Sequence, residues 1–299
     1  MNSICILLTD HESINEEIII SSYKNLLTAK INKIYFVGCQ KKFKKIYKKF
    51  NIKKKFKFID VNLKQNQYFE YLRFITNKAI KICKNEKDML ILNMPLNKKK
   101  FLKNKFPGFT EFFSYCVNKK KDENMLLYSE KEFSVCPLTT HIEIKNVEKN
   151  INKKKIENCI FNIVNFYRKL NKKIEIIVLG LNPHASIDFD KGTKDNMLIN
   201  KIVKNMSKKK INIKGPVSAD TAFMGNLRKK VFIGMYHDQV LIPFKALNKF
   251  DGINITIGKK ILRLSPDHGT AKNLKRERKY ISNKSFLRCL DFCSKKLNV

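Results

Sequence analysis

Three histidines each follow a short apolar run, a position from which imidazole side chains can bind a metal ion. The runs span residues 133–140, 174–183 and 231–236, and they end in His141, His184 and His237. Short runs rich in Val and Ile that stop at Gly, Pro or Asn are typical of buried strands. Ligands of open α/β sheets bind just beyond the carboxyl ends of the strands. Three imidazoles there could converge and leave an open coordination position, as in many catalytic metal sites. The alternative interpretation of any one of these histidines is that it is simply a polar residue at the edge of a loop and binds no metal.

Strand-like runs alternate with helix-like segments along the whole chain. Besides the three runs that end in histidine, the expected strands are Ser3–Leu8, Lys33–Cys39 and Met89–Asn93. The expected helices include Tyr68–Lys84 and Lys155–Leu170, and the lysine-rich stretches Asn97–Lys105 and Lys119–Asn124 are expected to be loops or exposed helix faces. Alternation of this kind predicts an α/β fold with a largely parallel sheet.

Length and composition limit the possible classes of protein. A chain of 299 residues can bury one large core or two modest ones. No apolar stretch approaches the roughly 20 residues that cross a membrane, and the first residues lack the basic segment and cleavage site of a secretory signal. The 8 cysteines show no zinc-finger spacing, so we expect reduced thiols in a cytoplasmic protein.

The chain is strongly basic, with 62 Lys and Arg against 26 Asp and Glu and a formal net charge of +36. The excess is almost entirely lysine, scattered through predicted helices and loops. Arginine, which is better suited to recognise phosphates and bases, is scarce. We interpret the charge as a solvated cationic surface without a specific nucleic-acid site, and expect weak nonspecific adhesion to RNA.

Several polar motifs occur in a fixed order, most densely between residues 215 and 271. In chain order they are Thr139-Thr140-His141, Gly180-Leu181-Asn182-Pro183-His184-Ala185, Gly215-Pro216-Val217-Ser218-Ala219-Asp220-Thr221, Met235-Tyr236-His237-Asp238-Gln239, Pro243-Phe244-Lys245, Gly252-Ile253-Asn254 and Arg263-Leu264-Ser265-Pro266-Asp267-His268-Gly269-Thr270. Together they resemble the 4-hydroxythreonine-4-phosphate dehydrogenase family of vitamin B6 biosynthesis, and the resemblance covers most of the chain.

The resemblance implies a fold and an activity. The fold would be the isocitrate and isopropylmalate dehydrogenase-like one, with two α/β/α domains and a cleft between them. The first domain would comprise residues 1–134 and 255–299 with the cofactor loop, and the second residues 135–254 with the metal ligands and dimer contacts. Family members oxidise 4-phosphooxy-L-threonine with NAD or NADP, and the β-keto acid formed loses carbon dioxide to give 3-amino-2-oxopropyl phosphate. A homodimer whose active site uses residues of both subunits is implied as well.

The resemblance also assigns roles to individual residues. His141, His184 and His237 would bind a divalent ion (zinc, magnesium or cobalt) that polarises the substrate hydroxyl. The residues that match substrate-binding positions are Thr110, Lys245, Asn254 and Arg263, and those that match the cofactor loop are Asp267, His268, Gly269 and Thr270. Asp238 and Lys245 are the candidate catalytic residues, and Asp238 would either orient His237 or accept a proton.

The chain departs from the family pattern at three places. The glycine-rich turn after the first strand has become Leu8–Glu17 without any glycine, Phe109 stands where the family has histidine, and Ser186–Asp190 replaces another glycine-rich stretch. Residues with side chains do not readily take positive φ, so cofactor binding at the first turn is expected to be altered. We expect a working dehydrogenase. The alternatives are a dehydrogenase of another phosphorylated hydroxy acid and a non-catalytic, basic metal- or RNA-binding relic.

Overall fold

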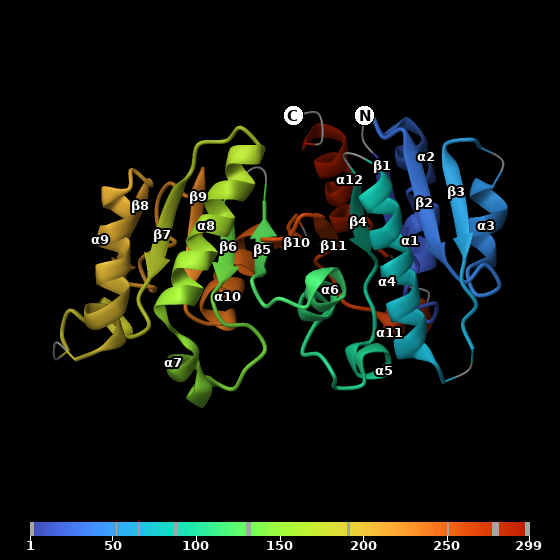
Figure 1. The fold of residues 1–299 in the computed structure, drawn as a ribbon. Helices are drawn as coiled ribbons and strands as arrows, with labels where there is room; N and C mark the ends of the chain where they lie inside the picture. The colour runs from blue at the N-terminus through green and yellow to red at the C-terminus, as the bar shows by residue number, and fades with distance from the viewer. Residues whose placement is uncertain are drawn as a thin grey trace. The chain divides into compact units, whose positions relative to one another are not determined.

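The computed structural model describes residues 3–51, 53–64, 66–86, 89–129, 133–189, 192–249, 251–276 and 281–296. The chain divides into two compact units (Figure 1). Unit 1 comprises Met1–Lys121 and Phe250–Val299, and unit 2 comprises Asp122–Lys249. The first boundary falls between Lys121 and Asp122, earlier in the sequence than the boundary expected after residue 134. The reason is that strand β5 (Asn124–Tyr128) pairs with β6 (Ser134–Pro137) and so belongs to unit 2.

The sheet of unit 1 has the strand order β3-β2-β1-β4-β11-β10. These strands are β1 (Ser3–Leu7), β2 (Lys33–Gly38), β3 (Phe56–Asp60), β4 (Met89–Asn93), β10 (Ile253–Ile257) and β11 (Arg263–Pro266). Neighbouring strands run parallel except for the antiparallel pair β10–β11. Every residue of β1 and β4 is buried, as expected for parallel strands that are covered on both faces.

The helices of unit 1 are α1 (Asn15–Ser21), α2 (Tyr23–Thr28), α3 (Lys44–Phe50), α4 (Tyr68–Asn85), α5 (Lys98–Leu102), α6 (Phe109–Asn118), α11 (Lys272–Arg276) and α12 (Lys284–Lys296). Helix α4 packs on the sheet through fully buried residues such as Leu72 and Ile75. The lysine-rich stretch 97–105 contains α5, in which Phe101 and Leu102 are buried and only the lysines at its start are exposed.

The sheet of unit 2 has the order β5-β6-β9-β7-β8, in which β7 is Glu175–Leu179, β8 is Ile213–Val217 and β9 is Lys230–Gly234. The pair β5–β6 is antiparallel and the other pairs are parallel. The helices are α7 (Val147–Asn150), α8 (Lys153–Lys169), α9 (Asn200–Lys208) and α10 (His237–Asn248), with shorter helical turns at Ile144–Asn146, Pro183–Ser186 and Asp195–Ile199. Figure 1 shows α8 lying across one face of these strands.

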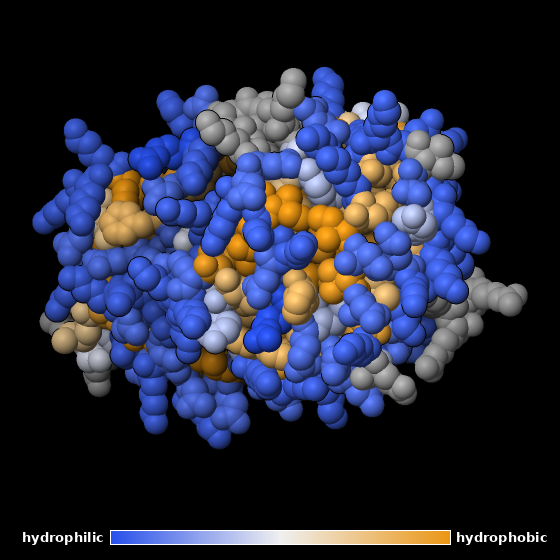
Figure 2. Space-filling view, turned by 45° about the vertical axis from the view of Figure 1, so that its right-hand side comes forward, coloured by the Kyte–Doolittle hydropathy of each residue, from blue (hydrophilic) through white to orange (hydrophobic). Residues whose placement is uncertain are grey.

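The six predicted strands and the two predicted helices are all present, which confirms the α/β fold. Strand β8 was missed because it contains Gly215 and Pro216, which are unfavourable inside a sheet; it lies at the end of the strand order, where proline is tolerated. None of the helices in the described ranges is both long and apolar enough to cross a membrane. Hydrophilic side chains cover most of the face shown in Figure 2, as the lysine content predicts.

Candidate functional site

The three histidines follow three neighbouring strands of unit 2. His141 follows β6, His237 follows β9 and His184 follows β7, and these strands lie side by side in the order β6-β9-β7. Because both pairs are parallel, their carboxyl ends meet at the same edge of the sheet. The ring centroids of His141 and His237 are 5.6 Å apart.

The third imidazole does not complete a preformed cluster. Among the residues that the structure describes, no three His, Cys, Asp or Glu side chains lie close enough together to hold a metal ion. The side chain of His184 is 61% exposed. The structure therefore brings His141 and His237 together and places His184 at the end of the next strand.

Two of the histidines are oriented by carboxylates. His184 Nδ1 lies 2.6 Å from Asp188 Oδ2, and His237 Nδ1 lies 2.6 Å from Asp238 Oδ1. The contact with Asp188 raises the pKa of His184. A carboxylate on Nδ1 fixes the ring and leaves Nε2 to face a ligand, which is the usual arrangement around metal-bound histidine. The chemistry of this donor set therefore fits a divalent metal, and Asp238 makes the contact with His237 that its predicted orienting role requires.

The segment that carries His184 folds back tightly on the end of β7. His184, Ala185 and Ser186 all have positive φ, at 50°, 51° and 61°. A side chain at Gly180 would place its Cβ 2.6 Å from the Cα of Ala185, so glycine is required there by close backbone approach. The altered stretch 186–190 begins within this turn at Ser186, and its last residue, Asp190, lies outside the described residues.

The predicted substrate-binding arginine is the centre of a buried polar cluster in unit 1. Arg263, on β11, is 3% exposed. Its guanidinium donates to side-chain oxygens of five residues, which are Asn93 (2.5 Å), Thr110 (3.4 Å), Asn254 (3.2 Å), Thr256 (3.3 Å) and Ser265 (3.0 Å). Burial lowers the pKa of Arg263, while the carboxylate of Glu111 opposes that effect. In the described part of the chain, this buried cation hydrogen-bonds only neutral groups, an arrangement that fits an anionic ligand.

The predicted substrate residues are thus divided between the units. Thr110 and Asn254 contact Arg263 directly. Lys245 lies on α10 of unit 2, eight positions after His237, and is exposed. Sequence reasoning missed Asn93, Thr256 and Ser265. The last two could have been found, since Asn254 and Thr256 on β10, and Arg263 and Ser265 on β11, alternate with apolar residues and so share one face of the sheet.

The predicted cofactor loop, Asp267–Thr270, begins where β11 ends. The amide of Asp267 donates to Ser285 Oγ (2.7 Å), which donates to the carbonyl of Gly252 (2.9 Å). His268 Nδ1 lies 2.9 Å from the carbonyl of Gly269, and burial lowers the pKa of His268. Its Nε2 is buried and has no hydrogen-bond partner among the described residues. Buried polar atoms normally have a hydrogen-bond partner. A ligand bound by this loop could supply the partner that His268 Nε2 lacks.

The first turn has no glycine and also needs none. No residue between Leu8 and Glu17 has positive φ. Instead, buried side chains hold the turn: Asn15 Nδ2 donates to the carbonyls of Asp10 (3.2 Å) and Pro95 (2.8 Å), and Asp10 Oδ1 accepts from the amide of Glu12 (3.0 Å). The expected difficulty with backbone conformation is therefore absent, because side-chain hydrogen bonds replace the glycine-rich turn.

The first turn and the cofactor loop are joined. The amide of Ile14 donates to the carbonyl of Thr270 (3.2 Å), and Glu12 forms ion pairs with Lys272 (2.6 Å) and Lys100. These segments follow β1 and β11, which flank β4 in a parallel part of the sheet. They therefore occupy the edge of unit 1 at which ligands of such sheets bind.

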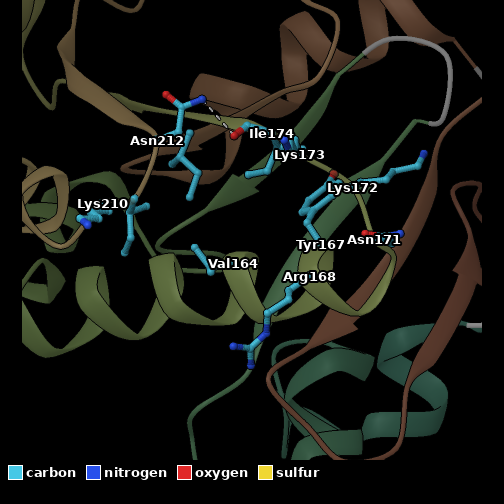
Figure 3. Close-up of a pocket in the computed structure, with 11 residues that line it drawn as sticks. Val164, Tyr167, Arg168, Asn171, Lys172, Lys173, Ile174, Lys210 and Asn212 are labelled. Carbon is cyan, nitrogen blue, oxygen red and sulfur yellow. Dashed lines mark hydrogen bonds between the residues drawn. The ribbon is translucent and has the colours of Figure 1, made fainter.

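A separate pocket, shown in Figure 3, lies at the other edge of the unit 2 sheet. Tyr167 and Arg168 at the carboxyl end of α8 line it, together with Lys172 and Lys173 before β7 and Asn212 before β8. It contains none of the predicted site residues. Basic side chains near the carboxyl ends of helices are favoured by the helix dipole alone, so we assign no chemistry to this pocket.

The fold defines the class of protein. The structure is similar to that of an isocitrate dehydrogenase from Methylococcus capsulatus, with a TM-score of 0.54, 12% identity and coverage of 97% of this chain and 84% of that chain. It is more similar to a 4-hydroxythreonine-4-phosphate dehydrogenase from Klebsiella pneumoniae, with a TM-score of 0.78, 25% identity and coverage of 100% and 98%. The protein is therefore an α/β protein of the isocitrate dehydrogenase-like fold, as predicted.

The family follows from the sequence comparisons. The model of the family described as pyridoxal phosphate biosynthetic protein PdxA matches residues 4–293. The chain belongs to this family, which confirms the resemblance found in its motifs. A curated relative from Aquifex aeolicus, a 4-hydroxythreonine-4-phosphate dehydrogenase, is 40% identical over 187 residues, which is 62% of this chain and 58% of the relative's length. A D-threonate 4-phosphate dehydrogenase from Pectobacterium atrosepticum is 33% identical over 186 residues, 60% of this chain and 56% of that protein.

Proposed function

We propose that this protein is an NAD- or NADP-dependent dehydrogenase that oxidises 4-phosphooxy-L-threonine and promotes decarboxylation to 3-amino-2-oxopropyl phosphate in pyridoxal 5'-phosphate biosynthesis. The observation that carries the proposal is the buried guanidinium of Arg263, which hydrogen-bonds only neutral side chains in the described part of the chain. Such a cation is stabilised by an anion with several oxygens, and arginine binds phosphates and carboxylates with paired N–H groups. Thr110 and Asn254 would complete this substrate site, and Lys245 would contribute a second cation.

The metal part of the proposal rests on the strand ends of unit 2. His141, His184 and His237 would hold a divalent ion (zinc, magnesium or cobalt), which when bound polarises the substrate hydroxyl and stabilises the ketone oxygen. Asp238 holds His237 through Nδ1. Binding would require His184 to approach the other two rings, because the three do not form a ligand cluster without the ion.

The nicotinamide cofactor would bind the edge of unit 1 at which Asp267–Thr270 meets the first turn. The buried Nε2 of His268 supports this assignment. A Cβ at Gly269 would meet no atom of the described residues within 4 Å, so this glycine leaves open space beside the described backbone. Backbone amides there could approach the cofactor closely.

We also propose a cytoplasmic homodimer in which both subunits contribute to the active site. All 8 cysteines are free thiols, which fits a reducing compartment. Large apolar side chains of unit 2 are exposed, among them Ile144 (70%), Ile187 (83%) and Met224 (70%). A second subunit that covered these side chains would remove their apolar surface from water. No specific nucleic-acid partner is proposed.

A second candidate is oxidation of a related phosphorylated hydroxy acid. Phe109 supports it, because a phenyl ring cannot donate the hydrogen bond that the family's histidine gives to the substrate. The similarity to a D-threonate 4-phosphate dehydrogenase also supports it.

The deciding experiment supplies metal-loaded protein with NAD or NADP and with either 4-phosphooxy-L-threonine or D-threonate 4-phosphate. The absorbance of the reduced nicotinamide is followed with time. Metal-dependent reduction with the first substrate supports the proposal, and reduction with the second alone favours the other candidate. If neither substrate leads to reduction of the nicotinamide in protein shown to bind metal, both candidate functions are overturned. RNA retention at physiological salt with a steep salt dependence would then point to a binding relic.

A further inference from the structure

Hydrogen bonds that do not involve the histidines link the three segments that carry them. We name these segments the β6 loop (138–142), the β9 loop (235–237) and the β7 loop (180–189). The backbone of Met235, in the β9 loop, is where the links meet. Its carbonyl accepts from Thr139 Oγ1 of the β6 loop (2.7 Å), and its amide donates to Gln239 Oε1 on α10 (2.7 Å).

Gln239 continues the link to the β7 loop. Its Nε2 donates to the carbonyl of Gly180 (2.7 Å), the first residue of that loop. The amide side chain of Gln239 therefore links the end of β9, through its oxygen, to the end of β7, through its nitrogen. Because Gly180 also has no room for a side chain, the start of the β7 loop is fixed relative to the β9 loop.

Asp195 holds three further residues of the β7 loop, which are Leu181, Asn182 and Ser186. It is fully buried, and its Oδ1 accepts from the amide of Leu181 (2.7 Å). Its Oδ2 accepts from the amide (3.1 Å) and the side chain (2.9 Å) of Asn182 and from the hydroxyl of Ser186 (2.7 Å). Hydrogen bonds to a carboxylate are stronger than those between neutral groups. They hold both ends of the turn in which His184 takes its left-handed conformation.

We propose that Asp195 and Gln239 are positioning residues of the metal site, which set the backbone from which His184 and His237 reach the ion. The inference rests on the proposed metal site and adds two residues that contact neither the ion nor the substrate. It explains how a turn with three consecutive non-glycine residues at positive φ keeps one conformation. A defined loop limits how far His184 must move to complete the ligand set.

The test uses Asp195→Asn and Gln239→Met in the full-length protein, with Glu157→Gln as the control. Asp195→Asn places an amide NH₂ against donors, and Gln239→Met keeps the size of the side chain but removes both hydrogen bonds. Glu157 is a carboxylate of unit 2 that pairs only weakly with Lys153 (4.0 Å), remote from these loops in the sequence. Affinity for Co²⁺ alone is measured by titration, and hydrogen exchange of backbone amides is measured in the metal-free protein.

We expect each variant to bind Co²⁺ about tenfold more weakly or worse, as for other residues that orient metal ligands, while Glu157→Gln binds like the wild type. The amides of Leu181 and Asn182 should exchange faster in Asp195→Asn, and that of Met235 faster in Gln239→Met. Unchanged Co²⁺ affinity in a folded Gln239→Met variant overturns the inference, even if Asp195→Asn fails to fold. A wild-type protein that binds no Co²⁺ instead overturns the proposed metal site, and amide exchange still decides whether these residues hold the loops.

Discussion

Phe109 covers the guanidinium of Arg263, with the Cζ atom of the arginine 4.9 Å from the centroid of the phenyl ring. The ring is 7% exposed and packs against Phe112 and Phe113. Phe109 stands where the family pattern has a histidine, so this chain exchanges a hydrogen-bond donor for an apolar face on the buried cation. An aromatic face stabilises a desolvated cation by about 2 kcal/mol and leaves its charge available to a bound anion.

Removing that ring should weaken substrate binding. We expect Phe109→Leu to raise the KM for the phosphorylated substrate by up to about thirtyfold, which corresponds to the roughly 2 kcal/mol of a cation–π contact with a desolvated cation. The control is Phe106→Leu, because Phe106 packs on Phe69 and Phe112 and makes no ring contact with Arg263. Initial rates against substrate concentration distinguish the two variants. Equal rises in KM would assign the effect to lost packing and contradict a role for the cation–π contact.

Arg263→Lys tests the anion site itself. Lysine has three donors on one nitrogen and cannot replace a planar group that donates to five side chains. We expect the KM to rise by at least about tenfold with a smaller change in kcat. The Tm should fall as well, because buried acceptors left unpaired cost about 1–3 kcal/mol each. Arg168→Lys, at an exposed position on α8 where the guanidinium donates to Asn165 (3.1 Å), is the control for the same change of side chain outside the cluster. An unchanged KM in Arg263→Lys would remove Arg263 from the substrate site.

The histidines of unit 2 can be tested one at a time. His184→Ala and His237→Ala should abolish both metal binding and turnover but leave the Tm nearly unchanged, since these side chains are 61% and 34% exposed and surface substitutions cost little stability. Metal affinity is measured by titration calorimetry and folding by circular dichroism. His11→Ala, in the first turn of unit 1, should bind metal like the wild type. Normal metal affinity in either of the first two variants would refute the assignment.

Much of the arrangement of the three histidines is predictable from sequence. Short runs of Val and Ile gave the strands, and the end of each run placed His141, His184 and His237 at one edge of the sheet. Whether the three rings converge was not predictable, because it depends on loop conformation. Asp195 illustrates the limit: it is 14 residues after Leu181 in the sequence, and only the folded β7 loop brings its carboxylate to that amide.

The glycine-free first turn shows a second limit. From the family pattern, the lost glycines implied altered cofactor binding, because residues with side chains do not readily take positive φ. The structure has no positive φ between Leu8 and Glu17, and hydrogen bonds of the Asn15 and Asp10 side chains hold the turn. A change in turn type cannot be seen by comparing residues position by position. It requires knowing which buried carbonyls, such as that of Pro95, are near enough to accept.

The ion pairs of Glu12 should make stability depend on pH in a defined range. Lys100 first, and then Lys272, lower the pKa of Glu12 from 4.5 to about 2. The carboxylate therefore stabilises the folded state fully above pH 4.5, and this contribution is lost as the pH falls through about 2. Because the side chain is 42% exposed, solvent screening limits the contribution to about 1 kcal/mol or less.

Glu12→Gln should thus be less stable than the wild type in urea unfolding near neutral pH. The difference should shrink as the pH falls below 4.5 and vanish only below about 2. The variant should also release Lys272, which follows the cofactor loop, so the Kd for NAD or NADP is expected to rise with it. Glu143 is an exposed carboxylate of unit 2 that contacts Lys145 (3.1 Å) and Asn146 (3.2 Å). Glu143→Gln serves as the control and should leave cofactor binding unchanged. A stability difference for Glu12→Gln that persisted undiminished at pH 2 would show that packing, and not the ion pairs, joins the first turn to this loop.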